Sequence, residues 1–264
     1  IPAGRITMNK TIILLLLLLS VMCHTQAQDE KKEQQLYRYA VKLEQEGKNS
    51  EALTIYKNLL RSDSSNIDYL WRTSFIYSKL GYDQPTEEQR QQWYKTAAYL
   101  GKKAVTQYPQ NANAHYAYAV SIGRMSENAG NRTKIDNAKL IKSEAELAIK
   151  LDPRLPGPYH IMGRWHRVVA AFSGFERAMI KAIFGGMPGG SYEDSIRNFE
   201  KAILLEPFNG IHYYEIAVSL LERNQTTDKQ LAKSWLQKAL NIPVKSTDDA
   251  ENKTKCEKLL KSLS

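Results

Sequence analysis

The sequence is almost without cysteine, which excludes a fold held together by disulfide bonds. It contains two cysteines, and Cys23 lies inside an apolar N-terminal segment that we expect to be removed. An exported chain with a single remaining cysteine cannot form an intramolecular disulfide. Cys256 lies on an apolar helical face near Leu259, Leu260 and Leu263, so we expect it to be a small core residue. A reactive role would need an exposed, electropositive setting.

Signatures of catalysis are missing as well. The sequence has no Gly-x-Ser-x-Gly motif and no catalytic Cys/His pattern. The stretch from Gly185 to Gly190 is rich in glycine, but no Lys-Ser/Thr pair follows it and no strand is expected before it. We therefore expect a loop there and not a phosphate cradle. The sequence predicts a protein that is not an enzyme and that needs no cofactor.

Histidines are few and are not spaced for metal binding. His160 and His166 are six residues apart, whereas a separation of four would bring two imidazoles onto one helical face. No carboxylate or cysteine stands beside them at the spacing of a zinc site, so no metal is expected. His115 and His166 fall at positions typical of helix packing, which favours a core or hydrogen-bonded role.

Long apolar runs are confined to the N-terminus. The run Ile12–Leu19 follows the basic residue Lys10 and ends near the small residue Ala27, which is typical of a secretory signal peptide. The run is too short for a membrane span, which needs about 20 apolar residues. We expect residues 1–27 to be upstream residues and signal peptide, and residues 28–264 to form the domain.

This N-terminal pattern predicts an exported protein, periplasmic or secreted, with no transmembrane span in the mature chain. Cleavage after Ala27 is the main expectation. A lipid anchor on Cys23 is the minor alternative, because Met22 stands before it where a small residue is expected.

Charge of one sign dominates only weakly. The formal net charge is +9, but basic and acidic residues are interspersed along the chain. Such mixing is typical of a solvated surface, and no recognisable nucleic-acid-binding module accompanies the basic residues. We therefore expect no nucleic-acid partner.

What the sequence does contain is a helical sequence motif that recurs along its length. Alanine, a bulky residue and a further pair such as Ala-Leu or Ala-Ile are followed by an acidic residue and proline in residues 148–153 and 199–207. Residues 97–109 repeat the pattern with Ala104-Val105 and Tyr108-Pro109, and weaker copies lie at 52–64, which lacks the proline, and at 232–243. The motif is typical of the second helix of a tetratricopeptide repeat. Small alanines let two antiparallel helices approach closely, and proline ends a helix because it lacks an N–H donor.

Each copy is preceded by a segment with the periodicity of a first helix: residues 34–46, 67–80, 112–125, 158–171 and 211–221. Thr86, Ser191 and Thr227 carry the pattern of helix N-caps. A last helix over residues 247–263 would cover the exposed end of the stack. The sequence therefore predicts an all-α fold, a tetratricopeptide-like helical-repeat superhelix of about five helix pairs with a C-terminal capping helix.

The fourth repeat carries an insertion between its two helices. The interval from Pro153 to Pro207 exceeds the usual repeat length of about 34 residues by about twenty. The inserted residues run from Phe172 to Gly190 and place apolar side chains at helical spacing, namely Phe172, Phe175, Met179 and Phe184. Two interpretations stay open: an extra helix packed on the array, or a lid that closes a pocket for an acyl chain or a partner helix.

First-helix positions predict a concave groove that is aromatic, with basic residues in its middle. The candidate binding residues are Tyr37, Arg72, Tyr116, Arg124, His160, Arg164, Arg167 and Tyr214. Arginine makes bidentate bonds to carboxylates and phosphates, and tyrosine supplies a rigid amphipathic wall, so the groove suits an acidic peptide or an anionic ligand. The alternative is that these arginines pair with carboxylates such as Glu127, Glu144 or Glu176 and only fix the stack.

Residues from about Asn66 to Leu263 resemble the regulator of microtubule dynamics family, which occurs in eukaryotes and has bacterial relatives. The resemblance rests on five segments, Tyr69-Leu70-Trp71-Arg72, Asn113-Ala114-His115-Tyr116, Gly163-Arg164-Trp165, Ser191-Tyr192-Glu193-Asp194 and Trp235-Leu236-Gln237-Lys238-Ala239. It implies a tetratricopeptide-like domain used for binding and tethering, without catalysis. The chain departs from the eukaryotic pattern because it starts with a signal peptide instead of a membrane anchor, so the activity in the family name is not carried over.

Together these observations predict a non-enzymatic binding or scaffold protein of the cell envelope. Its concave groove is expected to bind a protein segment. The alternative is a protein that binds a small molecule, a phospholipid or another amphiphile in a pocket closed by residues 172–190.

Overall fold

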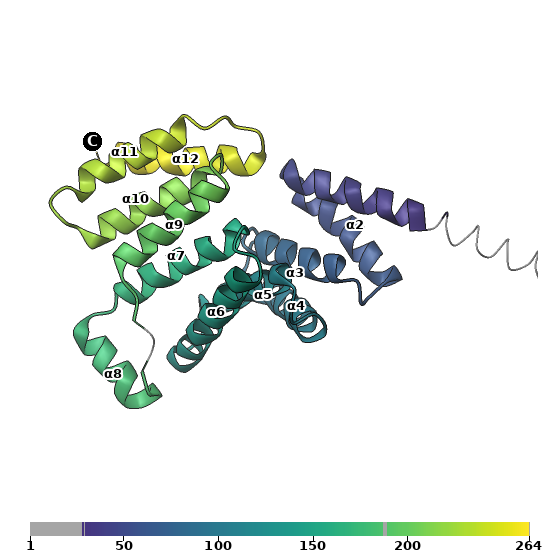
Figure 1. The fold of residues 1–264 in the computed structure, drawn as a ribbon, viewed down its shortest axis with the longest axis horizontal. Helices are drawn as coiled ribbons and strands as arrows, with labels where there is room; N and C mark the ends of the chain where they lie inside the picture. The colour runs from purple at the N-terminus through teal and green to yellow at the C-terminus, as the bar shows by residue number, and fades with distance from the viewer. Residues whose placement is uncertain (1–27, 29, 187–188, 264) are drawn as a thin grey trace, which may run out of the picture.

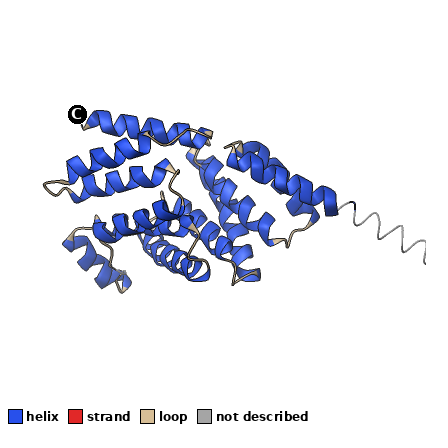
Figure 2. Cartoon of the chain, turned by 45° about the horizontal axis from the view of Figure 1, so that its top comes forward, coloured by secondary structure: helices blue, strands red, loops and turns tan. Residues whose placement is uncertain are grey.

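The computed structural model describes residue 28, residues 30–186 and residues 189–263. The predicted signal peptide, the Cys23 lipid anchor and Met187-Pro188 of the insert lie outside the described residues. The described residues form helices joined by short loops and contain no strand (Figure 2). Among them, no helix is both long enough and apolar enough to cross a membrane.

The helices form five consecutive antiparallel pairs and a final covering helix, as predicted (Figure 1). The pairs are the helix of residues 30–45 with α2 (Asn49–Ser62), α3 (Ile67–Gly81) with α4 (Glu87–Gln107), α5 (Ala112–Ser126) with α6 (Asn131–Leu151), α7 (Pro156–Ala170) with α9 (Tyr192–Leu205), and α10 (Gly210–Arg223) with α11 (Asp228–Leu240). The last helix, α12 (Thr247–Ser262), packs on α10 and α11. The predicted fold class is confirmed.

The alanines of the recurring motif lie where two helices cross. Ala52, Ala104, Ala148 and Ala202 are fully buried, each on the second helix of a pair. A methyl side chain at these points lets the helices approach closely, and larger side chains such as Phe199 fill the space beside them. Cys256 is also fully buried and burial raises its pKa to about 11, which confirms the predicted core role.

Two of the three predicted N-caps make their capping bonds. Thr86 and Gln89 form a reciprocal capping box, and the Ser191 hydroxyl accepts from the Asp194 N–H. Thr227 stands at the N-cap of α11 as predicted, but its side chain makes no capping bond. The neighbouring Asp228 carboxylate takes over the turn by accepting the Gln225 N–H at 2.9 Å and pairing with the guanidinium of Arg223.

The insertion of the fourth repeat forms α8 (Gly174–Phe184), which projects away from the stack (Figure 1). It has its own cap at each end: a Ser173–Glu176 capping box and a left-handed residue, Gly185. Phe175 and Met179 are 75% and 45% exposed, so they do not pack on the array. The insert therefore forms a helix, but this helix does not pack on the array, and its apolar side chains face solvent.

The array curls until its last helix reaches its first repeat. Thr247, at the start of α12, donates its hydroxyl to the carbonyl of Gly47 at 3.4 Å, and Lys79 of α3 forms an ion pair with Asp248. We call these four residues the clasp. Gly47 has a φ of +78° and no room for a Cβ beside Thr247, so the contact requires glycine for two reasons. The clasp lies beside the concave face, since Lys79 also lines the cavity described next.

Candidate functional site

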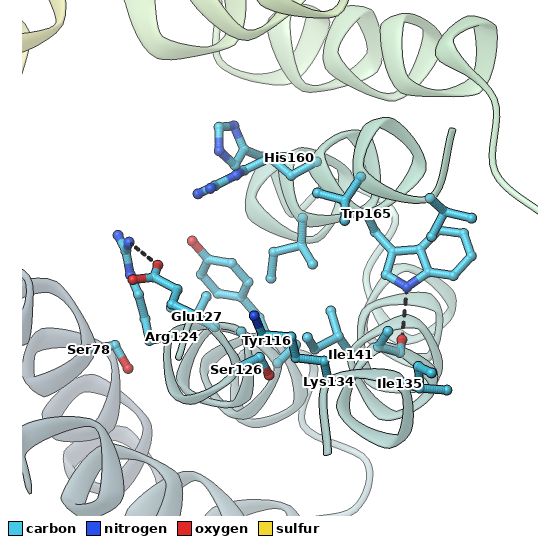
Figure 3. A pocket seen from close by; sticks show the side chains of 18 of the residues that line it. Ser78, Tyr116, Arg124, Ser126, Glu127, Lys134, Ile135, Ile141, His160 and Trp165 are labelled. Atoms are coloured by element: carbon cyan, nitrogen blue, oxygen red, sulfur yellow. Dashed lines mark hydrogen bonds and ion pairs between the residues drawn. The ribbon is translucent and has the colours of Figure 1, made fainter. Parts of the chain in front are cut away.

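The concave face holds a half-open cavity of about 590 Å³ (Figure 3). Helices α3, α5, α6 and α7 form its walls. Most of the lining is apolar and comprises Phe75, Val120, Ile135, Ile141, Ile161, Trp165, Val168, Val169 and Phe172. Trp165 is fixed because its indole N–H donates to the carbonyl of Ala138 at 2.8 Å. The cavity therefore offers a rigid apolar wall that no other part of the described chain covers.

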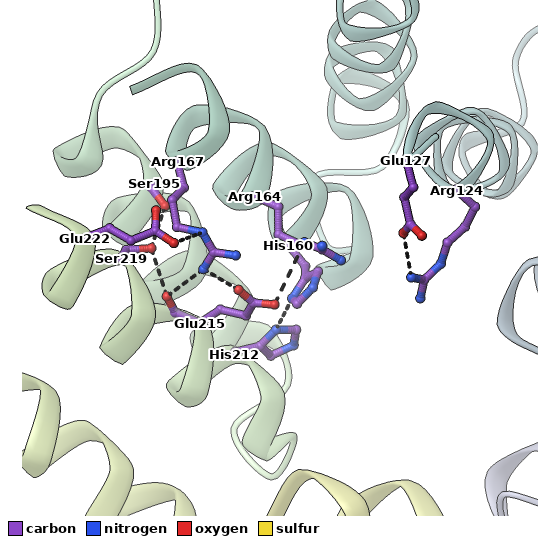
Figure 4. A network of polar contacts seen from close by, with 10 residues as sticks. All are labelled: Arg124, Glu127, His160, Arg164, Arg167, Ser195, His212, Glu215, Ser219 and Glu222. Atoms are coloured by element: carbon purple, nitrogen blue, oxygen red, sulfur yellow. Dashed lines mark hydrogen bonds and ion pairs between the residues drawn. The ribbon is translucent and has the colours of Figure 1, made fainter. Parts of the chain in front are cut away.

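One end of the cavity is polar and basic. Tyr116 and Arg124 reach it from α5, and His160 and Arg164 reach it from α7 (Figure 3 and Figure 4). These four belong to the predicted groove residues, and the structure brings them together. The Tyr116 ring lies against Gly157, where a Cβ would come within 2.3 Å of the phenol carbon Cζ. Burial raises the pKa of Tyr116, so its hydroxyl stays protonated and can donate.

The two arginines of the polar end are only loosely held. Arg124 pairs with Glu127 at 3.1 Å, one turn away on the same stretch of chain, and 43% of the Glu127 side chain is exposed. The nearest carboxylate to Arg164 is Glu215 at 3.9 Å, and 49% of the Arg164 side chain is exposed. The Arg124–Glu127 pair is partly exposed, and such pairs contribute about 0–1 kcal/mol. The Arg164–Glu215 contact is long, although Glu215 itself is buried, so both guanidinium groups can turn toward a ligand at little cost.

His160 continues into a hydrogen-bonded chain that leaves the cavity (Figure 4). Its Nδ1 lies 3.0 Å from the Nδ1 of His212, the contact drawn in Figure 4. The His212 Nε2 lies 3.2 Å from a carboxylate oxygen of Glu206. Burial lowers the pKa of His160 well below its usual range, and the charges of His212 and Arg164 act in the same direction. Burial acts to raise the pKa of Glu206, but hydrogen bonds from His212 and Asn209 outweigh it and leave that pKa lowered.

Arg167 is buried and lies outside the cavity lining. It forms ion pairs with Glu215 and, at 3.6 Å, with Glu222 (Figure 4). Ser219 donates to the Glu215 carbonyl at 2.8 Å and contacts Ser195 of α9. These bonds join α7, α9 and α10, so the structure places Arg167 in the packing between two repeats and not at a free surface.

Arg72 and Tyr37 lie in a separate cluster in the first repeats. The Arg72 guanidinium donates to the Tyr37 hydroxyl at 3.0 Å and to Glu44 at 2.8 Å, and it lies over the Trp71 ring at 4.3 Å. The Tyr56 hydroxyl donates to the same Glu44. Tyr214 is also away from the cavity, where it packs against the apolar cluster around Ile216.

The insert contributes one residue to the cavity. Phe172 lines it, whereas Phe175 and Met179 are exposed on α8. The side chain of Phe184 lies outside the described part of the structure. In this arrangement α8 does not cover the opening.

Sequence reasoning missed one wall of the cavity and the partners of His160. Ile135 and Ile141 belong to α6, a second helix, whereas the predicted groove used first helices alone. The apolar spacing of residues 135–141 is the signal that could have indicated this wall. His212 and Glu206 gave no such signal, because each is far from His160 in sequence.

The family profile and the curated relatives that match this chain carry the same family name. The profile described as Regulator of microtubule dynamics protein 1-3 matches residues 36–264. Regulator of microtubule dynamics protein 1 of Bos taurus is 30% identical over 216 residues, which cover 80% of this chain and 65% of that protein. Regulator of microtubule dynamics protein 2 of Mus musculus is 31% identical over 202 residues, which cover 76% of this chain and 48% of that protein. The chain thus spans only part of the length of these curated relatives.

A solved structure supports the fold. The crystal structure of a thermophilic TPR protein of Thermus thermophilus superimposes with a TM-score of 0.61 at 17% sequence identity. The match covers 85% of this chain and 98% of that one. At this identity the likeness concerns the helical-repeat architecture alone.

Proposed function

Because this chain belongs to the regulator of microtubule dynamics protein 1-3 family, whose profile spans residues 36–264, and folds as a helical-repeat array, we propose that it is a non-enzymatic scaffold protein. It binds a segment of a partner protein in the concave cavity. The activity in the relatives' names is not part of this proposal, because the chain spans only part of their length.

The observation that carries the proposal is the division of one cavity into an apolar wall and a basic end. A peptide segment offers both complements at once, because apolar and charged side chains recur at fixed spacing along a helix or strand. One Leu or Phe side chain buried against Trp165 and Val120 would contribute about 2 kcal/mol. Arg124 and Arg164 would then select an acidic segment over a basic one.

We place this role in the cell envelope. Support comes from the N-terminal pattern, in which a basic residue, an apolar run and a small residue follow one another between Lys10 and Ala27. Fractionation of cells that express the full-length chain would test it: a mature protein that begins near Gln28 in the periplasm or medium is expected, and an uncleaved cytosolic protein would contradict it.

A second candidate is the binding of a small molecule, a phospholipid or another amphiphile. The cavity volume of about 590 Å³ favours it, because small-molecule sites typically measure about 300–1,000 Å³. In that case α8 would have to move over the opening of the cavity. In this structure Phe172 is the one described residue of the insert that lines the cavity.

Site-specific photo-cross-linking tests the proposed function in the native envelope. A photoreactive phenylalanine analogue replaces Val168, which lines the cavity and is 57% exposed, and in a matched control it replaces Tyr99, which is 70% exposed outside the cavity. We expect a protein adduct from position 168 that is absent from position 99. Mass spectrometry of the adduct identifies its class.

The outcomes separate the candidates. An adduct with the mass of a lipid or metabolite at position 168 would favour the second candidate. Equal protein adducts at both positions, or none at position 168, would contradict binding in the cavity.

A further inference from the structure

The contact between His160 and His212 holds one proton. Their Nδ1 atoms are 3.0 Å apart, so one must donate and the other must accept. Two N–H groups would clash, and two bare nitrogens would repel each other. The pair therefore has two arrangements, which differ in the ring that carries the shared proton.

Glu206 decides between these arrangements when the pair is neutral. Its carboxylate can only accept, so the His212 Nε2 that lies 3.2 Å away carries a hydrogen. A neutral His212 then has a bare Nδ1, and the shared proton belongs to His160. The Nε2 of His160 is consequently bare. Because Nδ1 faces His212 and the ring lies edge-on to Phe199, Nε2 is the nitrogen left for the cavity that His160 lines.

Uptake of one proton reverses the roles. A proton that arrives at the His160 Nε2 lets the shared proton pass to the His212 Nδ1. His212 is then a cation that donates to Glu206 and to His160, and His160 is again neutral. The cavity-facing nitrogen has changed from an acceptor to a donor, while the new positive charge rests beside Glu206. This agrees with the lowered pKa of His160, which disfavours a charge on that ring.

The groups around this nitrogen select an anion. Arg124 from α5 and Arg164 from α7 share the polar end of the cavity with the Tyr116 hydroxyl, for which the described residues provide no hydrogen-bond partner. Other charged groups around the hydrogen-bonded residues His160, His212 and Glu206 are Arg167 of α7, Glu215 of α10, Glu127 after α5 and Asp249 of α12. Arg167 and Glu215 form a buried ion pair outside the lining. The charged residues that line the cavity are Lys79, Arg124, Lys134 and Arg164 against Glu127, so its net charge is positive.

We propose that the polar end of the cavity is a carboxylate-binding subsite, in which one proton taken up by the Glu206–His212–His160 chain turns the His160 Nε2 into a donor to the bound carboxylate. This rests on the proposed function, and the carboxylate is the C-terminus or an acidic side chain of the partner segment. Arg124, Arg164 and Tyr116 supply the remaining donors. Binding and proton uptake strengthen each other by linkage.

Matched peptide probes test the subsite. The probes are N-acetyl-leucyl-phenylalanine with a free carboxylate, the same dipeptide as its C-terminal amide, and octyl phosphate as an anion of the lipid type. Calorimetry measures binding to the mature chain between pH 8 and pH 6, where a peptide carboxylate stays ionised. We expect the acid to bind more tightly than the amide, and its affinity to rise by up to about tenfold per pH unit as the pH falls, the limit for one coupled proton.

Variants isolate the histidine chain. His212→Gln and Glu206→Gln should each abolish the pH dependence while Arg124 and Arg164 keep part of the preference for the acid. His166→Gln is the matched control, because His166 lies on the same helix and is partly buried but does not line the cavity. Circular dichroism checks that each variant folds, and ¹⁵N spectra of the imidazoles report which nitrogen of His160 carries hydrogen at each pH.

Four results would overturn the proposal. The first is equal binding of the acid and the amide at pH 6, and the second is a pH dependence that survives in both His212→Gln and Glu206→Gln. The third is a His160 Nε2 that carries hydrogen throughout the pH range, and the fourth is no binding by any probe. If octyl phosphate bound and neither dipeptide did, the ligand of this subsite would be a lipid anion and not a peptide carboxylate. The cross-linking experiment at Val168 tests the proposed function separately, so a protein adduct there together with any of these results would remove the subsite alone.

Discussion

Two arginines of the predicted groove have different surroundings. Arg72 is held by Tyr37, Glu44 and the face of Trp71, and 18% of its side chain is exposed. Arg164 has one distant carboxylate and is half exposed. Sequence alone gave both the same expected role in binding, because partners from another helix are invisible in the spacing of a single helix.

We expect Arg72→Ala to lower the free energy of unfolding by about 2 kcal/mol, since it leaves the largely buried Glu44 with the Tyr56 hydroxyl but without its cation. Arg164→Ala should change it by less than about 0.5 kcal/mol, as is typical of exposed side chains. Urea unfolding followed by circular dichroism measures both. If Arg164→Ala destabilised the fold as much as Arg72→Ala, Arg164 would be a structural residue and not a free binding group.

His115 is a second residue with a definite protonation state. Its Nε2 faces the carbonyl of Pro109 at 2.9 Å and its Nδ1 faces the carboxylate of Glu144, so both nitrogens must donate. The bond with Glu144 raises the pKa of His115 despite burial, which acts in the opposite direction. The predicted packing role of His115 is thus combined with a positive charge.

The raised pKa predicts a pH-dependent stability. A raised folded pKa contributes stability that is full below the unfolded value of about 6.5 and is lost as the pH rises through the folded value. We expect wild type to exceed Glu144→Gln by about 1.5 kcal/mol at pH 5.5, the size of a hydrogen bond between charged groups, and by less at pH 9. Unfolding in urea at the two pH values checks this. A difference that is the same at both would mean that His115 is neutral throughout.

At the scale of elements, α8 and α9 illustrate opposite uses of phenylalanine. Phe199 of α9 is fully buried, whereas Phe175 of α8 is 75% exposed. Arg177 fixes α8 by donating to the carbonyls of Val169, Ala170 and Phe172 at the end of α7. The helix is therefore anchored at its base, and its apolar stripe is left open.

We expect Phe175→Glu to leave the free energy of unfolding within about 0.5 kcal/mol of wild type. Phe199→Ala should cost about 3–5 kcal/mol through loss of contact and a cavity. Thermal unfolding monitored by circular dichroism compares the two. A large loss of stability in Phe175→Glu would mean that α8 packs on the array in solution.

The helical elements could be predicted because their causes are local. Alanine spacing, proline stops and oxygen caps act within one helix, which is why the pairing of α7 with α9 was predicted across an insertion. The capping bond of Thr227 was wrong, because the Asp228 carboxylate accepts the N–H of Gln225 in the same turn. The position of α8 could not be predicted, since an apolar stripe fits packing and exposure equally well. The cavity was predicted in part: Tyr116, Arg124, His160 and Arg164 converge, but the wall on α6 and the His212–Glu206 partners depend on how whole repeats stack.

For the whole molecule, the clasp sets how far the array can open. Lys79 and Asp248 are partly exposed, and such a pair contributes about 0–1 kcal/mol. We expect Lys79→Ala to change stability little and to widen the molecule. The distance between spin labels in place of Lys57 and Lys258, measured by pulsed electron resonance, should become longer and more broadly distributed. A distance distribution identical to that of wild type would mean that the ion pair does not limit the opening.

The Gly47–Thr247 contact also concerns the number of repeats. In an open solenoid each unit touches only its neighbours, so units can be added or lost without disturbing distant parts. Here the first and last units touch each other. One unit more would carry Thr247 past the Gly47 turn, and one unit fewer would leave it short. Among the described residues this contact fits an array of five helix pairs, and duplication of one pair would have to break it.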